Sequence, residues 1–140
     1  MILIRYADVL LMYAESKIEL GEIDDSVYDA INEVRQRPTV EMPAITTGKS
    51  QEELRAIIRD ERAVELAFEG LRLYDMNRWK IGEEKVGTVE GLYYFNTASG
   101  EWETITSGLT RTFRADRDYL WPIPQVEMEI NDNITQNPNY

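Results

Sequence analysis

Apolar residues recur at helical spacing through the first twenty positions, and this pattern constrains the fold more than any other feature of the sequence. They form two neighbouring rows, one of Ile4, Ala7, Leu11, Ala14 and Ile18, the other of Leu3, Tyr6, Leu10 and Tyr13. The strip left for water is narrow and runs through Arg5, Asp8, Met12, Glu15 and Glu19. A helix that is apolar over most of its circumference needs partners on two sides. We therefore expect missing sequence upstream and interpret the chain as the C-terminal portion of a longer protein.

Residues that typically start or end helices predict a helical hairpin over residues 1–38. Gly21 ends the first helix, because glycine readily adopts the left-handed conformation found just past a last turn. Asp24 or Asp25 caps the second helix, and Pro38 stops it, because proline lacks the amide hydrogen that the helix needs. The apolar face of this second helix carries Val27, Ile31 and Val34. Two helices with so short a connection pack antiparallel, and their spacing resembles a tetratricopeptide unit.

Residues 50–80 predict a long helix that begins with a capping box. Ser50 and Glu53 have the spacing at which each side chain bonds the backbone amide of the other. Gly70 predicts a bend, after which the helix resumes towards Trp79. The expected buried face consists of Leu54, Ile57, Ile58, Val64, Phe68 and Leu71.

Residues 86–107 are rich in β-branched and aromatic side chains and predict a β-hairpin with a four-residue loop, Thr97 to Gly100. If Asn96 pairs with Glu101, the strands alternate their side chains between two faces. One face then carries Tyr93, Phe95 and Trp102, and the other carries Leu92, Tyr94 and Ile105.

The tail over residues 119–140 contains three prolines, Pro122, Pro124 and Pro138, which forbid a long helix. We expect an extended segment with at most a short helical turn at 126–129. The predicted fold class is mainly α. It combines a tetratricopeptide-like helical hairpin with a long helix, a small β-hairpin and an extended, proline-rich tail, in a single domain over residues 1–140.

Charge and missing residue types exclude several functions. The chain has 26 acidic and 15 basic side chains, so its net charge of −11 repels phosphate backbones and argues against a nucleic-acid partner. It contains neither cysteine nor histidine, which excludes disulfides, thiolate and histidine metal sites, and Ser-His-Asp catalysis. We expect no cofactor.

Three glutamates, Glu61, Glu65 and Glu69, follow one another at four-residue spacing on the predicted helix. Glu61 falls on the apolar face and is expected to be the most buried acid of the chain. A carboxylate buried alone costs several kcal/mol, so we expect an ion pair rather than a general acid with a raised pKa. The candidate partners are Arg35, Arg37 and Arg78. A metal site would need ligands from a facing helix, which the sequence does not supply.

The aromatic residues of the hairpin are the better functional candidates. Tyr93, Phe95 and Trp102 on one face form a flat apolar platform on which the C–H face of a sugar ring can stack, and we predict them as ligand-binding residues. The alternative is that these rings cover the helices.

Four blocks of sequence, in order, resemble the SusD/RagB family. They read "IRYADVLLMYAES", "LGEIDDSVYDAINEVRQRP", "LRAIIRDERAVELAFEGLRLYDMNRWKIGE" and "YLWPIPQVEMEINDNITQNPNY". The resemblance covers nearly the whole chain except about residues 85–115. It implies an α-helical, tetratricopeptide-containing lipoprotein of the Bacteroidetes, exposed at the surface of the outer membrane, with its lipid anchor in the missing N-terminal part.

The same resemblance implies a function. Such proteins capture glycans or other nutrients and pass them to a SusC-like TonB-dependent transporter, so we expect a binding protein and not an enzyme. Two alternatives stay open at this point. One is a glycoside hydrolase that uses Glu61 with Glu65 or Asp75, and the other is a helical repeat for general protein interaction.

Overall fold

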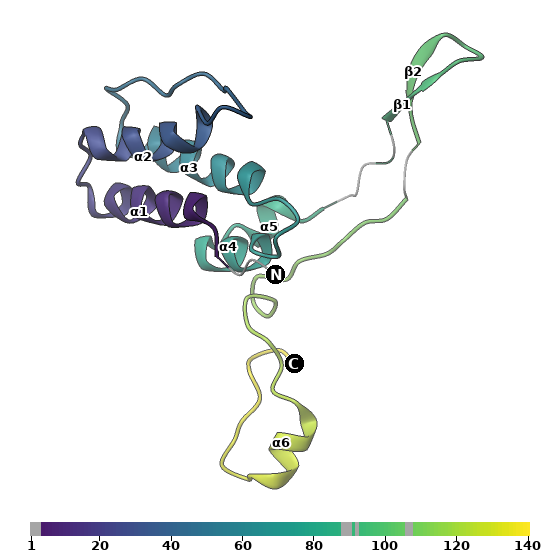
Figure 1. Cartoon of the computed structure of the whole chain (residues 1–140). Helices are drawn as coiled ribbons and strands as arrows, with labels where there is room; N and C mark the ends of the chain where they lie inside the picture. The colour runs from purple at the N-terminus through teal and green to yellow at the C-terminus, as the bar shows by residue number, and fades with distance from the viewer. Residues whose placement is uncertain (1–3, 88–90, 92, 106–107) are drawn as a thin grey trace. The chain divides into compact units, whose positions relative to one another are not determined.

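The computed structural model describes residues 4–87, 91, 93–105 and 108–140 (Figure 1). The chain divides into two compact units, Met1–Arg72 and Leu73–Tyr140, and each is described by itself. The assignment of residues 1–140 to one domain of a longer protein stays a prediction. No helix among the described residues is long and apolar enough to cross a membrane.

The first unit begins with the predicted helical hairpin, α1 (Tyr6–Leu20) and α2 (Asp25–Arg35). Gly21 adopts the left-handed conformation with φ 74°, and its amide donates to the carbonyl of Ile18. The side chain of Asp24 caps α2 by accepting from the amide of Ser26. The mainly helical class, with a tetratricopeptide-like hairpin, is therefore confirmed.

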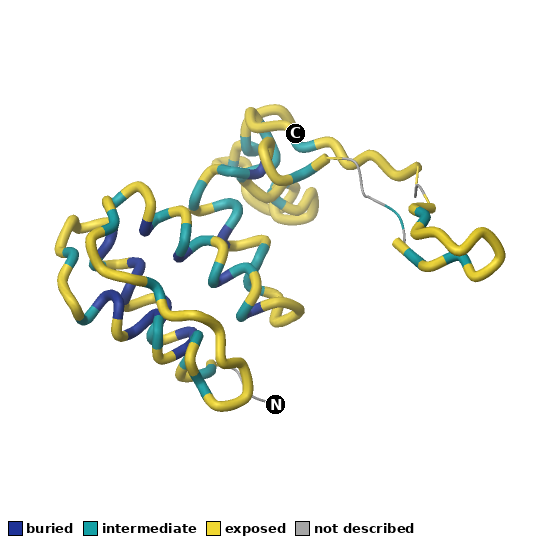
Figure 2. Tube along the Cα trace, turned by 90° about the horizontal axis from the view of Figure 1, so that it is seen from above, coloured by how far each residue is buried: buried dark blue, intermediate teal, exposed yellow. Residues whose placement is uncertain are grey.

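The third helix, α3 (Gln51–Glu65), packs against α1 and completes the core of the first unit (Figure 1). Its capping box is formed as predicted, because Ser50 and Glu53 bond each other's backbone amides. Figure 2 shows that most of the buried residues lie on these three helices. The core consists of Leu11, Ala14, Ile18, Val27, Tyr28, Ala30, Ile31, Val34, Leu54 and Ile58.

Between residues 65 and 72 the helical path is interrupted. The α3 helix ends at Glu65, and α4 (Arg72–Trp79) starts after a turn in which Phe68 and Gly70 both have positive φ, 64° and 82°. The expected bend near Gly70 is thus a complete break. The prediction that Val64 and Phe68 are buried is wrong. Val64 borders an open groove that Val40 and Met42 also line, and Phe68 follows the end of the helix.

The second unit contains α4, α5 (Gly82–Lys85), β1 (Tyr93–Asn96), β2 (Glu101–Thr104) and α6 (Gln125–Ile130). The two strands pair antiparallel with Asn96 opposite Glu101 and Phe95 opposite Trp102, which is the predicted register. The helical turn of the tail is α6. A polar side chain binds the end of the tail back onto its start: Asn137 donates to the carbonyl of Trp121 at 2.6 Å.

Candidate functional site

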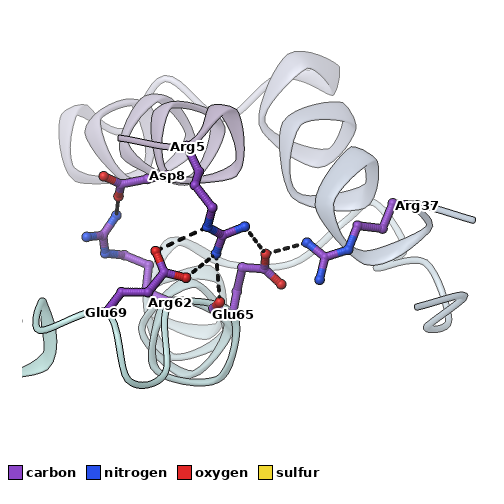
Figure 3. A network of polar contacts seen from close by, with 6 residues as sticks. All are labelled: Arg5, Asp8, Arg37, Arg62, Glu65 and Glu69. Atoms are coloured by element: carbon purple, nitrogen blue, oxygen red, sulfur yellow. Dashed lines mark hydrogen bonds and ion pairs between the residues drawn. The ribbon is translucent and has the colours of Figure 1, made fainter. Parts of the chain in front are cut away.

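The acidic row formed by Glu61 and Glu65 on α3 and Glu69 in the turn after it is an ion-pair network, as the sequence predicted. Glu61 pairs with Arg35, one of the three candidate arginines. Glu65 pairs with Arg37 and, at 2.8 Å, with Nη1 of Arg5. Figure 3 shows the Arg5 guanidinium lying between the carboxylates of Glu65 and Glu69, with Nη2 at 2.6 Å from Oε1 of Glu69. These contacts neutralise all three acids.

The prediction that Glu61 is the most buried acid is wrong, because Asp8, Glu15 and Asp75 are more deeply buried. Asp8 and Glu15 were expected to face water, but their side of α1 faces α3. There Arg62, only 5% exposed, donates from Nη1 to Oδ1 of Asp8 at 2.9 Å and has Nε at 3.7 Å from Oε2 of Glu15. The helical periodicity of the sequence identified Asp8 and Glu15 as polar positions, but it could not show which residues they contact.

The pKa shifts of Arg5 and Glu65 agree with a structural role for the ion-pair network. Hydrogen bonds to Glu69 and then Glu65 raise the pKa of Arg5. Burial acts to raise the pKa of Glu65, but hydrogen bonds from Arg37 and Arg5 outweigh burial and hold that pKa below its ordinary value. The carboxylate of Glu65 is therefore kept ionised, which is the opposite of what a general acid requires.

Replacing Glu65 with glutamine should destabilise the first unit at neutral pH by roughly 1–2 kcal/mol, because two guanidinium groups lose a charged acceptor. A carboxyl with a depressed pKa stabilises the fold above its unfolded pKa and loses this effect as pH falls through the folded value. The difference from the unmutated protein should accordingly shrink below about pH 4.5 in urea denaturation. Glu22→Gln, at an exposed site, is the control. A difference that stays constant down to pH 3 would contradict this account.

The arrangement of the glutamates was also compared with that of a metal site. Among the described residues, no group of three or more carboxylate, histidine or cysteine side chains could hold a metal ion. Glu61 and Glu65 border a groove of about 370 Å³, which Val40, Met42 and Arg35 also line. Both acids are ion-paired there, so neither is available as a free base.

The hairpin presents the three predicted ligand-binding residues together. The rings of Tyr93 and Trp102 are stacked, with centroids 5.0 Å apart and planes at 17°, and Phe95 meets Trp102 edge-on at 5.5 Å and 64°. We call these three residues the aromatic face. Their exposed fractions are 64% for Tyr93, 60% for Trp102 and 47% for Phe95, so much of each ring is accessible. An open cluster of rings can stack against an apolar ligand surface.

A polar cluster around Glu103 forms the opposite face of the hairpin, and sequence reasoning missed it. Glu103 accepts hydrogen bonds from Ser99 Oγ at 2.8 Å, Asn96 Nδ2 at 2.9 Å and Tyr94 Oη at 3.0 Å. These bonds, from Ser99 first, lower the pKa of Glu103. Leu92, expected on this face, lies outside the described residues. The alternation that placed Tyr94 opposite Glu103 was the available signal.

The tetratricopeptide-like pair α1 and α2, with α3 packed against α1, is the arrangement of a helical-repeat protein. The sequence model of the SusD family matches residues 1–140, and the chain belongs to this family. Among curated relatives, SusD-like protein P2 of Formosa agariphila is 35% identical over 97% of this chain, and SusD-like protein P25 of the same organism is 41% identical over 97%.

Solved structures agree with this assignment. A SusD-like protein from Bacteroides fragilis has a TM-score of 0.85 and 39% identity over 99% of this chain, which corresponds to 26% of that protein. A SusD-like carbohydrate binding protein from the same species has a TM-score of 0.79 and 36% identity, and the match covers 94% of this chain and 28% of that one. The chain spans about a quarter of the length of these relatives: 25% for P2 and 23% for P25.

Proposed function

We propose that the protein binds a glycan at the cell surface, as the SusD-like component of a TonB-dependent uptake system in the outer membrane. Membership in the SusD family supports this function, as does the likeness to a SusD-like carbohydrate binding protein from Bacteroides fragilis. The partners would be an oligosaccharide or other nutrient and a SusC-like TonB-dependent transporter. A lipid anchor would hold the protein at the membrane.

The main structural support for this proposal is the aromatic face formed by Tyr93, Phe95 and Trp102. A pyranose ring has one or two faces on which C–H groups dominate, and these groups carry partial positive charge. Aromatic faces carry negative charge density and a large apolar area, so they attract such a surface and bury it from water. Tyr93 and Trp102 are stacked on each other, so the faces that a sugar would meet are the ones turned away from this contact.

Truncation of Trp102 tests the site. Trp102→Ala should weaken glycan binding by about tenfold or more, or at least about 1.4 kcal/mol, because it removes the ring that both other aromatics contact. A glycan array identifies the ligand, and calorimetry on the intact protein measures the affinity. Tyr93→Ala should also weaken binding, and circular dichroism checks that each variant is folded.

Trp121→Ala is the matched control, because Trp121 is an exposed tryptophan of the tail and lies outside the hairpin. Its affinity should equal that of the unmutated protein. If Trp102→Ala and Tyr93→Ala both bind glycan normally, the aromatic face is structural and the site lies elsewhere.

We infer further that the protein is not an enzyme. The carboxylates that a two-acid glycosidase mechanism would use are ion-paired: Glu61 with Arg35, and Glu65 with Arg5 and Arg37. Asp75, the remaining candidate, pairs with Arg78 at 2.9 Å. Glycan turnover by the intact protein that disappears in Glu61→Gln would overturn this inference.

A further inference from the structure

The polar cluster around Glu103 lies on the opposite face of the hairpin from the three rings, and it joins both strands and the loop. We propose that Glu103 is a positioning residue, which holds the hairpin in the strand register that brings the rings of the aromatic face together. The inference rests on the proposed function, because it assumes that the aromatic face contacts the glycan.

The bonds to Glu103 fix how the two strands align. Tyr94, which is directly opposite Glu103 in the strand register, donates to its Oε2 at 3.0 Å. Asn96, two residues further along β1, donates to its Oε1 at 2.9 Å. Successive side chains of a strand point to opposite faces, so a slip of the pairing by one residue would break both bonds. The same slip would turn the rings of one strand away from the ring of the other. The register that Glu103 fixes is therefore the one on which the aromatic face depends.

Glu103 also holds the loop that joins the strands. Ser99 in this loop donates from Oγ to Oε1 of Glu103 at 2.8 Å. The side chain of Asn96, which bonds Glu103 through Nδ2, accepts from the amide of Ala98 through Oδ1 at 2.9 Å. Gly100 completes the turn with φ 74° and donates its amide to the carbonyl of Asn96 at 2.8 Å. One carboxylate thus connects β1, the loop and β2.

Burial indicates that the polar face contributes more than the rings to the order of the hairpin. Tyr94, Asn96 and Glu103 are each partly buried, whereas the three rings are exposed by 47% to 64%. A two-stranded hairpin by itself is only marginally stable in water, so side-chain contacts of this kind decide how much of the time it is formed. Hydrogen bonds to an ionised acceptor are stronger than those to a neutral one. We therefore expect the rings to stay stacked only while the Glu103 carboxylate is bonded to its partners.

Glu103→Gln tests the proposal in the intact protein, because glutamine keeps the size of the side chain and removes the charge that its donors share. Near-ultraviolet circular dichroism without ligand reports the order of the rings, since rings in a fixed orientation give a signal that rotating rings lose. The contribution of the aromatic face is the difference between the spectra of the unmutated protein and Trp102→Ala. In Glu103→Gln this contribution should fall to about a fifth, and the glycan affinity measured by calorimetry should fall about fivefold, because only the fraction with stacked rings binds.

Glu101→Gln is the matched control, because it removes the same charge from the same strand at an exposed position. It should leave the ring signal and the affinity unchanged. Ser99→Ala and Tyr94→Phe each remove one donor and keep the carboxylate, so each should lower the affinity by about twofold. These milder variants decide the question if Glu103→Gln unfolds the hairpin. In the Glu103→Gln background they should have little further effect, because they act through Glu103.

The outcomes separate this inference from the proposed function. A ring signal that Glu103→Gln leaves unchanged, or equal losses in Glu103→Gln and Glu101→Gln, overturns the positioning role and leaves glycan binding intact. Loss of the ring signal with undiminished affinity also overturns it, because the glycan would then not need stacked rings. If the unmutated protein binds no glycan on the array, the proposed function fails, and the ring signal still decides whether Glu103 orders the aromatic face.

Discussion

Replacing Arg62 with alanine is expected to lower the free energy of unfolding of the first unit by about 3–5 kcal/mol. The substitution removes the guanidinium that contacts Asp8 and Glu15 and leaves both carboxylates inside the protein. Asp8 would then have to bind a proton, admit water or move away from α3. Urea denaturation at pH 7, followed by circular dichroism at 222 nm, measures the loss.

Arg55 provides the matched control. It also pairs a guanidinium on α3 with an acid on α1, because its Nε and Nη2 lie at 2.8 Å and 2.7 Å from the carboxylate oxygens of Glu19. This pair is partly solvated, so Arg55→Ala should cost only about 0–1 kcal/mol. Equal losses in the two variants would show that the burial of Arg62 has no energetic consequence and would contradict the prediction.

The second large effect is expected from Leu54→Ala in α3. Leu54 is fully buried in the core that α1 and α2 also form, so its truncation removes apolar contacts and leaves a cavity among helices that relax only partly. The expected loss is about 2–5 kcal/mol. Thermal unfolding should show a markedly lower midpoint, because a small helical unit has a small unfolding entropy.

Leu20→Ala tests whether the site, and not the residue type, causes this loss. Leu20 is largely exposed at the end of α1, so the same change there should alter stability by about 0.5 kcal/mol or less. If Leu54→Ala were as mild as Leu20→Ala, Leu54 would not be a core residue of the folded protein in solution.

Local patterns in the sequence predicted the elements of the fold well. The αL glycine at Gly21, the cap at Asp24 and the Ser50–Glu53 capping box are formed as expected, because each depends on residues adjacent in the chain. The strand register was also predictable, since a four-residue loop and alternation fix which residues face each other. These local patterns were enough to place Phe95 opposite Trp102.

Predictions about burial were less reliable. Val64 and Phe68 have the residue types of a core face and are exposed, whereas Asp8 and Glu15 have the types of a solvated face and are buried. In the candidate site, the three aromatic residues could be named from sequence. The cluster around Glu103 could not, because Ser99 reaches it from the loop and side-chain geometry decides which donors converge.

By itself, the sequence determined where the first three helices begin and how the two strands pair, because caps, turn residues and side-chain alternation act over a few neighbouring positions. It did not determine the break between Glu65 and Arg72, where a bend was expected. Only the tertiary structure decided which charged residues became the interior of the first unit. An acid on a helix has the same local preferences whether it faces water or an arginine of another helix. The free energy that distinguishes these two states comes from desolvation and from Arg62, which lies 54 residues from Asp8 along the chain.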